Sequence, residues 1–154
     1  MDYMATDRFE YRYFINAPAE QVYAHLADPA SYVGLSPLVI AVEDVEHSTD
    51  EQGRAVVRYL STERFNFLGF IRYDNRIRVT TTLTQQQIVS DVDSPFWVRV
   101  NFVFDLQPEG GGTWIQETIS AQMPGLLQGF VIREAKSVQL ARAQILKQRL
   151  EKAS

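Results

Sequence analysis

The sequence contains no cysteine, which excludes disulfide bonds, thiolate metal sites and cysteine nucleophiles. It has no basic run and a net charge of −4, so it lacks the positive surface that binding to a nucleic-acid backbone requires. No stretch approaches the roughly 18 apolar residues of a membrane-spanning helix, and the first residues do not resemble a signal peptide. We therefore expect a cytoplasmic protein with no nucleic-acid partner and no stable membrane insertion.

Histidine is scarce, and the glycines are not arranged for phosphate binding. His25 and His47 fall in different predicted elements and have no metal-binding spacing. The glycines at 110–112 precede a strand and lack the helix and Lys-Ser/Thr of a phosphate-binding loop, so they indicate a hairpin. The sequence therefore predicts neither a metal nor a cofactor, and it offers no compact catalytic constellation.

What the chain does have is apolar and aromatic residues. It has 154 residues, of which 45% are hydrophobic and 22% charged, with 9 Phe, 7 Tyr and 2 Trp. A chain of this length folds as one domain that buries about 70% of its unfolded surface. We predict a single domain over 1–154, in which the aromatic rings fill a core or line a pocket.

Most of the chain shows the period-two alternation of half-buried strands. The first such segment, 8–16, places Phe9, Tyr11 and Tyr13 on one face. Six more follow between short polar turns, at 38–46, 54–65, 70–82, 87–93, 96–106 and 113–123. With no helix between these six, neighbouring strands should pair antiparallel.

Helices are predicted at two places. Pro18 begins one short helix at its first helical position, and Asp28 caps a second that ends near Gly34. After residue 125 the period changes to 3.6, which predicts a final helix of about 26 residues and roughly 39 Å. Its stripe consists of Leu127, Val131, Glu134, Val138, Ala141 and Ile145. Outside the stripe, and in need of flank packing or a partner, are Ile132, Leu140, Leu146 and Leu150.

This order of elements resembles the helix-grip fold of the START-like polyketide cyclase/dehydrase and lipid-transport superfamily. The segment FINAPAEQVYAHLADPASY at 14–32 is similar to the superfamily's opening pattern, and ILKQRLE at 145–151 is similar to its closing helical turn. The resemblance implies an α+β domain in which a curved seven-stranded antiparallel sheet, in the order β-α-α-β6-α, wraps on the C-terminal helix.

The resemblance also implies a cavity that binds or transports a hydrophobic small molecule, such as a lipid, a polyketide or an isoprenoid. The alternatives are a polyketide cyclase/dehydrase-type enzyme acting on such a ligand, and a protein-interaction module. The cavity lining should come from alternate strand residues and the helix stripe. The predicted ligand-binding residues are Tyr11, Tyr13, His25, Tyr59, Phe67, Tyr73, Asn75, Phe102, Phe104, Leu127, Phe130, Val131, Glu134 and Val138.

The polar members of this set have two interpretations each. Glu134 is costly to bury in an apolar stripe unless Arg142 or a strand arginine pairs with it, and otherwise it reaches water. Asn75 either points inward or marks a bulge. His25 either packs structurally or serves as a switchable acid or base in the pocket. The tyrosine hydroxyls either orient a ligand or are satisfied within the core.

Two segments should form the entrance. The turn at 65–70 carries three phenylalanines, which suits a cavity lid, a membrane-touching tip or a homodimer contact. Gly125 and Gly129 loosen the start of the final helix, and we hypothesise that this end moves to admit ligand.

Overall fold

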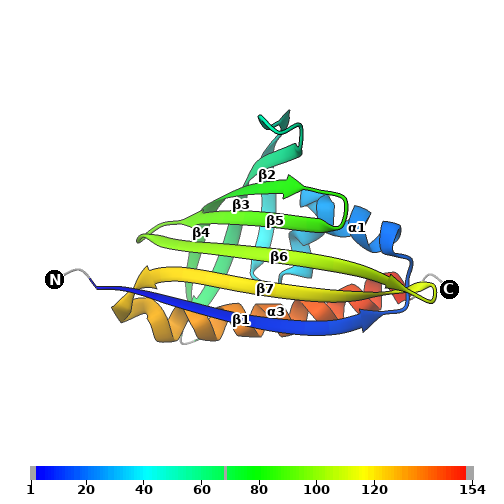
Figure 1. The fold of residues 1–154 in the computed structure, drawn as a ribbon. Coiled ribbons are helices and arrows are strands. Elements are labelled where there is room, and N and C mark those ends of the chain that lie inside the picture. Colours follow the sequence, from blue (N-terminus) through cyan, green and yellow to red (C-terminus); the bar gives the residue numbers. More distant parts are fainter. Residues whose placement is uncertain (1–2, 68, 152–154) are drawn as a thin grey trace.

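A curved antiparallel sheet and a long C-terminal helix lying along its concave side make up most of the molecule (Figure 1). The structure, a computed structural model, describes residues 3–67 and 69–151, without the side chain of Phe67. Within this part of the chain, none of the helices combines the length and the apolar character that a bilayer-spanning segment needs.

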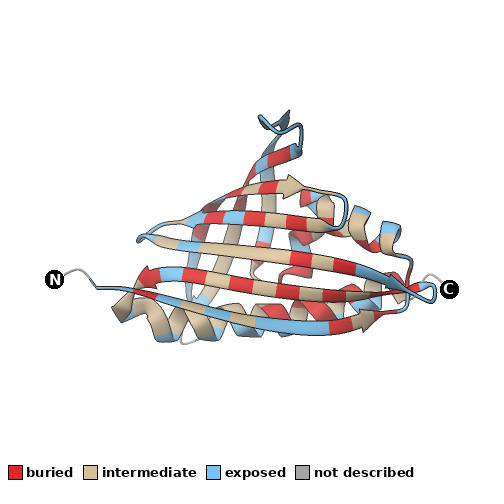
Figure 2. Ribbon diagram, in the orientation of Figure 1, coloured by how far each residue is buried: buried red, intermediate tan, exposed pale blue. Residues whose placement is uncertain are grey.

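The seven strands follow the predicted order. They are β1 (Met4–Ile15), β2 (Val39–Thr49), β3 (Ala55–Phe67), β4 (Ile71–Leu83), β5 (Gln87–Ser94), β6 (Val98–Glu109) and β7 (Gly112–Pro124). The spatial order is β1-β7-β6-β5-β4-β3-β2, and every pair is antiparallel. Figure 2 shows buried residues alternating with less buried ones along β7, as a sheet covered on one face requires. The predicted α+β helix-grip architecture is confirmed.

The helices are α1 (Ala19–Ala27), the 3-10 turn η1 (Pro29–Ser31), α2 (Tyr32–Leu35), the 3-10 turn η2 (Gly125–Leu127) and α3 (Gln128–Glu151). Pro18 was expected at the first helical position, but its extended backbone makes it the cap residue, and α1 begins one residue later. Asp28 caps η1 as expected, because its carboxylate accepts from the backbone N–H of Ala30 at 3.0 Å. Gly34, with a φ of 82°, lies one residue before the end of α2 and gives the segment a kink.

Helix α3 uses two faces, rather than the single predicted stripe. Its C-terminal half packs into the main core through Ala143, Leu146 and Leu150. The two leucines, expected outside the stripe, are therefore core residues. Leu140 is 51% exposed. The N-terminal half keeps contact with β1 and β7, where Val131 and Ile132 pack against a cluster that includes Met123. The split arises because the curved sheet turns its other strands away from the straight helix.

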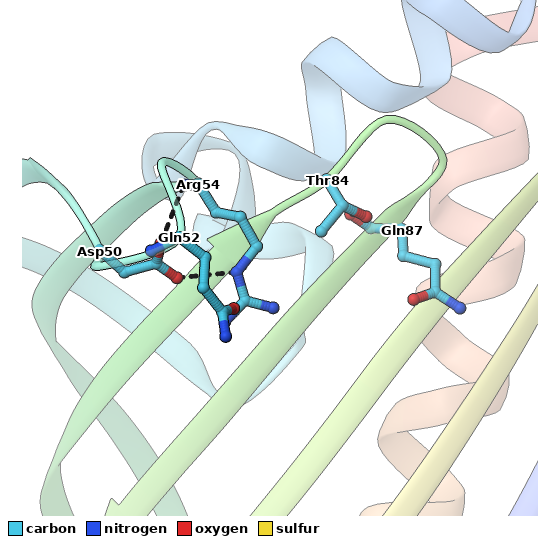
Figure 3. Close-up of polar contacts among 5 residues, drawn as sticks. All are labelled: Asp50, Gln52, Arg54, Thr84 and Gln87. Atoms are coloured by element: carbon cyan, nitrogen blue, oxygen red, sulfur yellow. Dashed lines mark hydrogen bonds and ion pairs between the residues drawn. The ribbon is translucent and has the colours of Figure 1, made fainter.

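The turns at the two ends of the sheet differ in character. In the β2–β3 turn, the Asp50 carboxylate accepts from the backbone N–H of Gln52 and of Arg54, both at 2.9 Å, and from Nε of Arg54 at 2.7 Å (Figure 3). In the β4–β5 turn, the N–H of Thr84 donates to the carbonyl of Gln87 at 3.0 Å. The opposite end carries several exposed apolar side chains. The most exposed of them in its turns we call the apolar rim: Phe70, Phe96, Trp97 and Leu126.

Candidate ligand-binding cavity

A cavity of about 460 Å³ lies between the N-terminal half of α3 and the inward-facing residues of strands β3 to β6. It forms where the curved sheet turns these strands away from α3, so that side chains of the strands and of the helix border a space that they do not fill. Ligand-binding cavities measure roughly 300–1,000 Å³.

Many of the predicted ligand-binding residues line this cavity. They are Tyr59, Tyr73, Asn75, Phe102, Leu127, Phe130, Val131, Glu134 and Val138. They come together because odd-numbered residues of β3 and β4, and even-numbered residues of β6, face the helix. The structure thus places these side chains around one space, and their contact with a ligand stays a prediction.

The other predicted residues lie elsewhere. Tyr13 and Phe104 are buried in the main core, and Tyr11 stacks on Tyr13 with ring centroids 5.4 Å apart at the edge of the sheet. His25 contacts the last turn of α3, where its Nε2 lies 3.1 Å from Nη1 of Arg149. The side chain of Phe67 is outside the described residues. The strand alternation identified the inward face correctly, but that face serves the core at one end of α3 and the cavity at the other.

The most buried polar contact joins Glu117 of β7 to Arg142 of α3. Glu117 is 0% exposed and Arg142 is 5% exposed. Nη2 of Arg142 donates to Oε1 of Glu117, and Nη1 donates to Oγ of Ser36 at 2.9 Å. The guanidinium also lies 5.1 Å from the ring centre of Phe102. Arg142 lines the cavity, whereas Glu117 lies behind it.

Sequence reasoning missed Glu117, and it named Arg142 only as a partner for Glu134. In the structure the partner of Arg142 is Glu117. The signal was present, because Glu117 falls between Ile115 and Ile119 on the inward face of β7. A carboxylate at that position had to be buried, and a buried carboxylate requires a cation.

Three atoms near this pair have no hydrogen-bond partner among the described residues: Oη of Tyr13, Oε2 of Glu117 and Nε of Arg142. Burial raises the pKa of the Tyr13 hydroxyl, and the charge of Glu117 raises it further. Burial also raises the pKa of Glu117, while Arg142 opposes the increase. Unsatisfied buried polar atoms cost roughly 1–3 kcal/mol each, so this region has hydrogen-bonding capacity to offer a water or a ligand.

A second polar group lines the opposite wall of the cavity. Asn75 is 8% exposed and points inward, and its Nδ2 donates to Oγ of Ser94 at 3.0 Å. The side chain of Asn75 also forms a hydrogen bond with the carboxyl group of Glu63, which is its cross-strand neighbour on β3. Burial raises the pKa of Glu63; the bond from Asn75 and the charge of Arg142 lower it, and the charge of Glu134 raises it. The wall therefore presents a protonatable carboxyl to the cavity.

The cavity reaches the end of the sheet that carries the apolar rim. The ring of Phe65 lies 5.7 Å from that of Phe130, between β3 and the first turn of α3. Phe96 and Trp97, in the β5–β6 turn, both have positive φ angles, of 65° and 60°. Bulky residues adopt this region at a cost of roughly 1–2 kcal/mol. Such strain is typical of functional sites.

The described residues contain no group of three or more His, Asp or Glu side chains that could hold a metal ion. The charged side chains that line the cavity are Glu63, Glu134 and Arg142.

Comparisons with known proteins place this geometry among related folds. No protein-family model matches the sequence. A search of the curated proteins finds no match either. Solved structures do match. A protein from Thermus thermophilus is 22% identical with a TM-score of 0.64, and the match covers 96% of this chain and 99% of that one.

Two further matches carry descriptive names. The Zhui aromatase/cyclase from Streptomyces sp. R1128 is 16% identical with a TM-score of 0.68, covering 96% of this chain and 94% of that one. A START superfamily protein from Mycobacterium smegmatis is 16% identical with a TM-score of 0.69, covering 98% of this chain and 99% of that one. At these identities the matches establish the fold. The chain has the helix-grip fold that START superfamily proteins and aromatase/cyclases share.

Proposed function

We propose that this protein binds or transports a hydrophobic small molecule, such as a lipid, a polyketide or an isoprenoid, in the cavity under α3. The observation that carries the proposal is the 460 Å³ cavity, whose lining is mainly aliphatic and aromatic. A ligand that buries about 300 Å² of apolar surface there gains roughly 7 kcal/mol before the cost of association. The fold shared with START superfamily proteins supports the same function.

Binding can be tested with N-phenyl-1-naphthylamine, a neutral apolar dye that fluoresces when water is excluded. Ala135 lines the cavity from α3, so Ala135→Trp should fill it. We expect this variant to weaken dye binding at least about tenfold, a difference of about 1.4 kcal/mol. Leu140→Trp is the matched control, because it adds the same ring to the solvent side of the same helix.

Native mass spectrometry after mild purification gives an independent measurement and would reveal a co-purified ligand. If the dye binds neither variant nor wild type, or if Ala135→Trp binds it as well as Leu140→Trp does while keeping its circular dichroism spectrum, the cavity is not a binding site.

A second candidate is a cyclase/dehydrase-type enzyme acting on a polyketide-like ligand. The observation that favours it is Glu63, a carboxyl group that lines the cavity and whose pKa burial raises, as a general acid requires. The aromatase/cyclase among the structural matches fits this alternative. Incubation with a synthetic poly-β-ketone should then give loss of water by mass spectrometry in the wild type and not in Glu63→Gln.

The apolar rim supports a third possibility, contact with a second copy of the chain. Trp97 and Phe70 are 79% and 80% exposed, which is unusual for side chains this large. Analytical ultracentrifugation over a range of concentrations tests the homodimer, and a monomer at all concentrations would contradict it. A cytoplasmic location, the absence of a nucleic-acid partner and the absence of stable membrane insertion remain parts of the proposal.

A further inference from the structure

The cavity holds two carboxyl groups on walls that face one another. Glu63 lines it from β3, two residues from Phe65 and on the same face of the strand. Glu134 lines it from α3, about one helical turn from Phe130. The rings of Phe65 and Phe130 lie 5.7 Å apart. The two glutamates therefore lie beside the same ring contact, one on the sheet and one on the helix.

Neither of these carboxyl groups has a cation. No ion pair among the described residues involves Glu63 or Glu134. Arg142 is the cation of the lining, and its charge is already matched in the buried ion pair with β7. Arg64, next to Glu63 in the sequence, faces the other side of the sheet and pairs with Asp74 at 2.8 Å. With both cavity carboxylates ionised, the pocket therefore has an excess of negative charge.

Polar contacts on the sheet hold Glu63 in place. Its hydrogen bond with Asn75 lowers the pKa of the carboxyl, so the amide of Asn75 is the donor. Nδ2 of Asn75 also donates to Oγ of Ser94 at 3.0 Å. Burial nevertheless raises the pKa of Glu63, and the charge of Glu134 raises it as well. A positive charge placed beside Glu63 would therefore stabilise its ionised form.

Resting on the proposed binding function, we infer that the ligand is an apolar amine, whose ammonium group pairs with Glu63 and whose hydrocarbon part contacts the aliphatic and aromatic lining. The ammonium donates to the Glu63 carboxylate and places its positive charge on the same side of the cavity as Glu134. Glu63 is already largely desolvated in the folded protein, so pairing removes water mainly from the ammonium. A ligand carboxylate would add a third negative charge, which is unfavourable in an apolar cavity. An alcohol would leave both carboxylates without a cation.

The experiment compares decylamine, decanol and decanoate as competitors of N-phenyl-1-naphthylamine at about pH 7.5, where decylamine carries a positive charge. The three share one hydrocarbon chain, so differences between them come from the head group. In the wild type we expect decylamine to bind at least about tenfold more tightly than decanol, and decanol more tightly than decanoate.

Two variants and a control test which residue causes this preference. In Glu63→Gln the advantage of decylamine over decanol should fall at least about fivefold. Glu134→Gln should lower the same advantage by a smaller factor, because its carboxylate acts through its charge. Glu46→Gln, an exposed position on β2, is the matched control and should leave the advantage unchanged.

The outcomes separate this inference from the proposed function. If the dye does not bind the wild type, the proposed function is wrong. If the dye binds but the advantage of decylamine over decanol is below about tenfold, the amine inference is wrong and hydrophobic binding stands. An advantage that Glu63→Gln leaves unchanged also overturns the inference, because the ammonium would not pair with Glu63. Should Glu63→Gln not bind the dye, an advantage that is unchanged in Glu134→Gln overturns the inference.

Discussion

At the scale of single residues, loss of one partner of the buried Glu117–Arg142 pair should lower the free energy of unfolding strongly. Breaking a buried ion pair by removing one partner leaves an uncompensated charge, which typically costs 3–5 kcal/mol. We expect Arg142→Met to lower the free energy of unfolding by about that amount. Urea denaturation followed by circular dichroism provides the measurement.

The double variant Glu117→Leu/Arg142→Met should recover most of the loss, because two apolar side chains replace the pair without an orphaned charge. Asp93→Asn removes one partner of the exposed Arg99–Asp93 pair and should leave the urea midpoint nearly unchanged. A double variant as unstable as the single one would show that the cost comes from lost packing.

Glu63 makes a pH-dependent contribution to stability. Burial raises the pKa of its carboxyl above the usual value of 4.5, so the folded state holds this proton more firmly than the unfolded state. The contribution is therefore fully present below about pH 4.5 and is lost as the pH rises through the folded-state pKa. We expect Glu63→Gln to gain stability relative to wild type between pH 4 and pH 7, measured by urea denaturation at each pH. A constant difference across this range would argue against a raised pKa.

At the scale of elements, the β5–β6 turn stores backbone strain in an exposed position. Trp97 has a φ of 60°, in a region where asparagine is far more common than tryptophan. Trp97→Asn should therefore raise the free energy of unfolding by up to about 1 kcal/mol. Phe70→Asn is the control, because Phe70 is similarly exposed but is not among the residues with positive φ. Equal effects of the two substitutions would assign the gain to reduced apolar exposure.

The start of α3 is the second element with a testable property. Gly129 has free space around its missing Cβ, so Gly129→Ala should fit without a clash and stabilise the helix by up to about 1 kcal/mol. If this end moves to admit ligand, the variant should also take up dye more slowly in stopped-flow fluorescence. Hydrogen exchange should find residues 125–130 less protected than 138–145, and equal protection would exclude the gate.

The sequence predicts the elements well, because each depends on local signals: period-two alternation, Asp28 as a cap, Gly34 with positive φ, and the change of period after residue 125. The division of α3 into a core face and a cavity face was not predictable from periodicity. It depends on the curvature of a sheet whose strands are distant in sequence. For the same reason, Tyr13 and Phe104 could not be distinguished from the cavity residues on the same face.

At the scale of the whole molecule, binding should stabilise the fold. A ligand present at about 100 times its dissociation constant adds about 2.7 kcal/mol to the free energy of unfolding. For a domain of this size that corresponds to a rise in melting temperature of roughly 5–10 °C. Thermal unfolding followed by circular dichroism with decylamine tests this expectation. Ala135→Trp should show no such rise, and a rise equal to that of the wild type would place the ligand outside the cavity.

The fixed attachments of α3 are concentrated at one end. Arg149 donates to the carbonyls of Ser31 at 2.6 Å and of Val33 at 3.0 Å, and Glu151 accepts from the N–H of Asn16 at 2.8 Å. We therefore expect the N-terminal part of α3 to pivot about the ion pair between Arg142 and Glu117. The stretch from Gln128 to Arg142 spans about 21 Å, so a tilt of about 5° would move the helix start by about 2 Å. We expect a rotation of this size to widen the cavity at the helix start while Ala143, Leu146 and Leu150 stay packed in the main core.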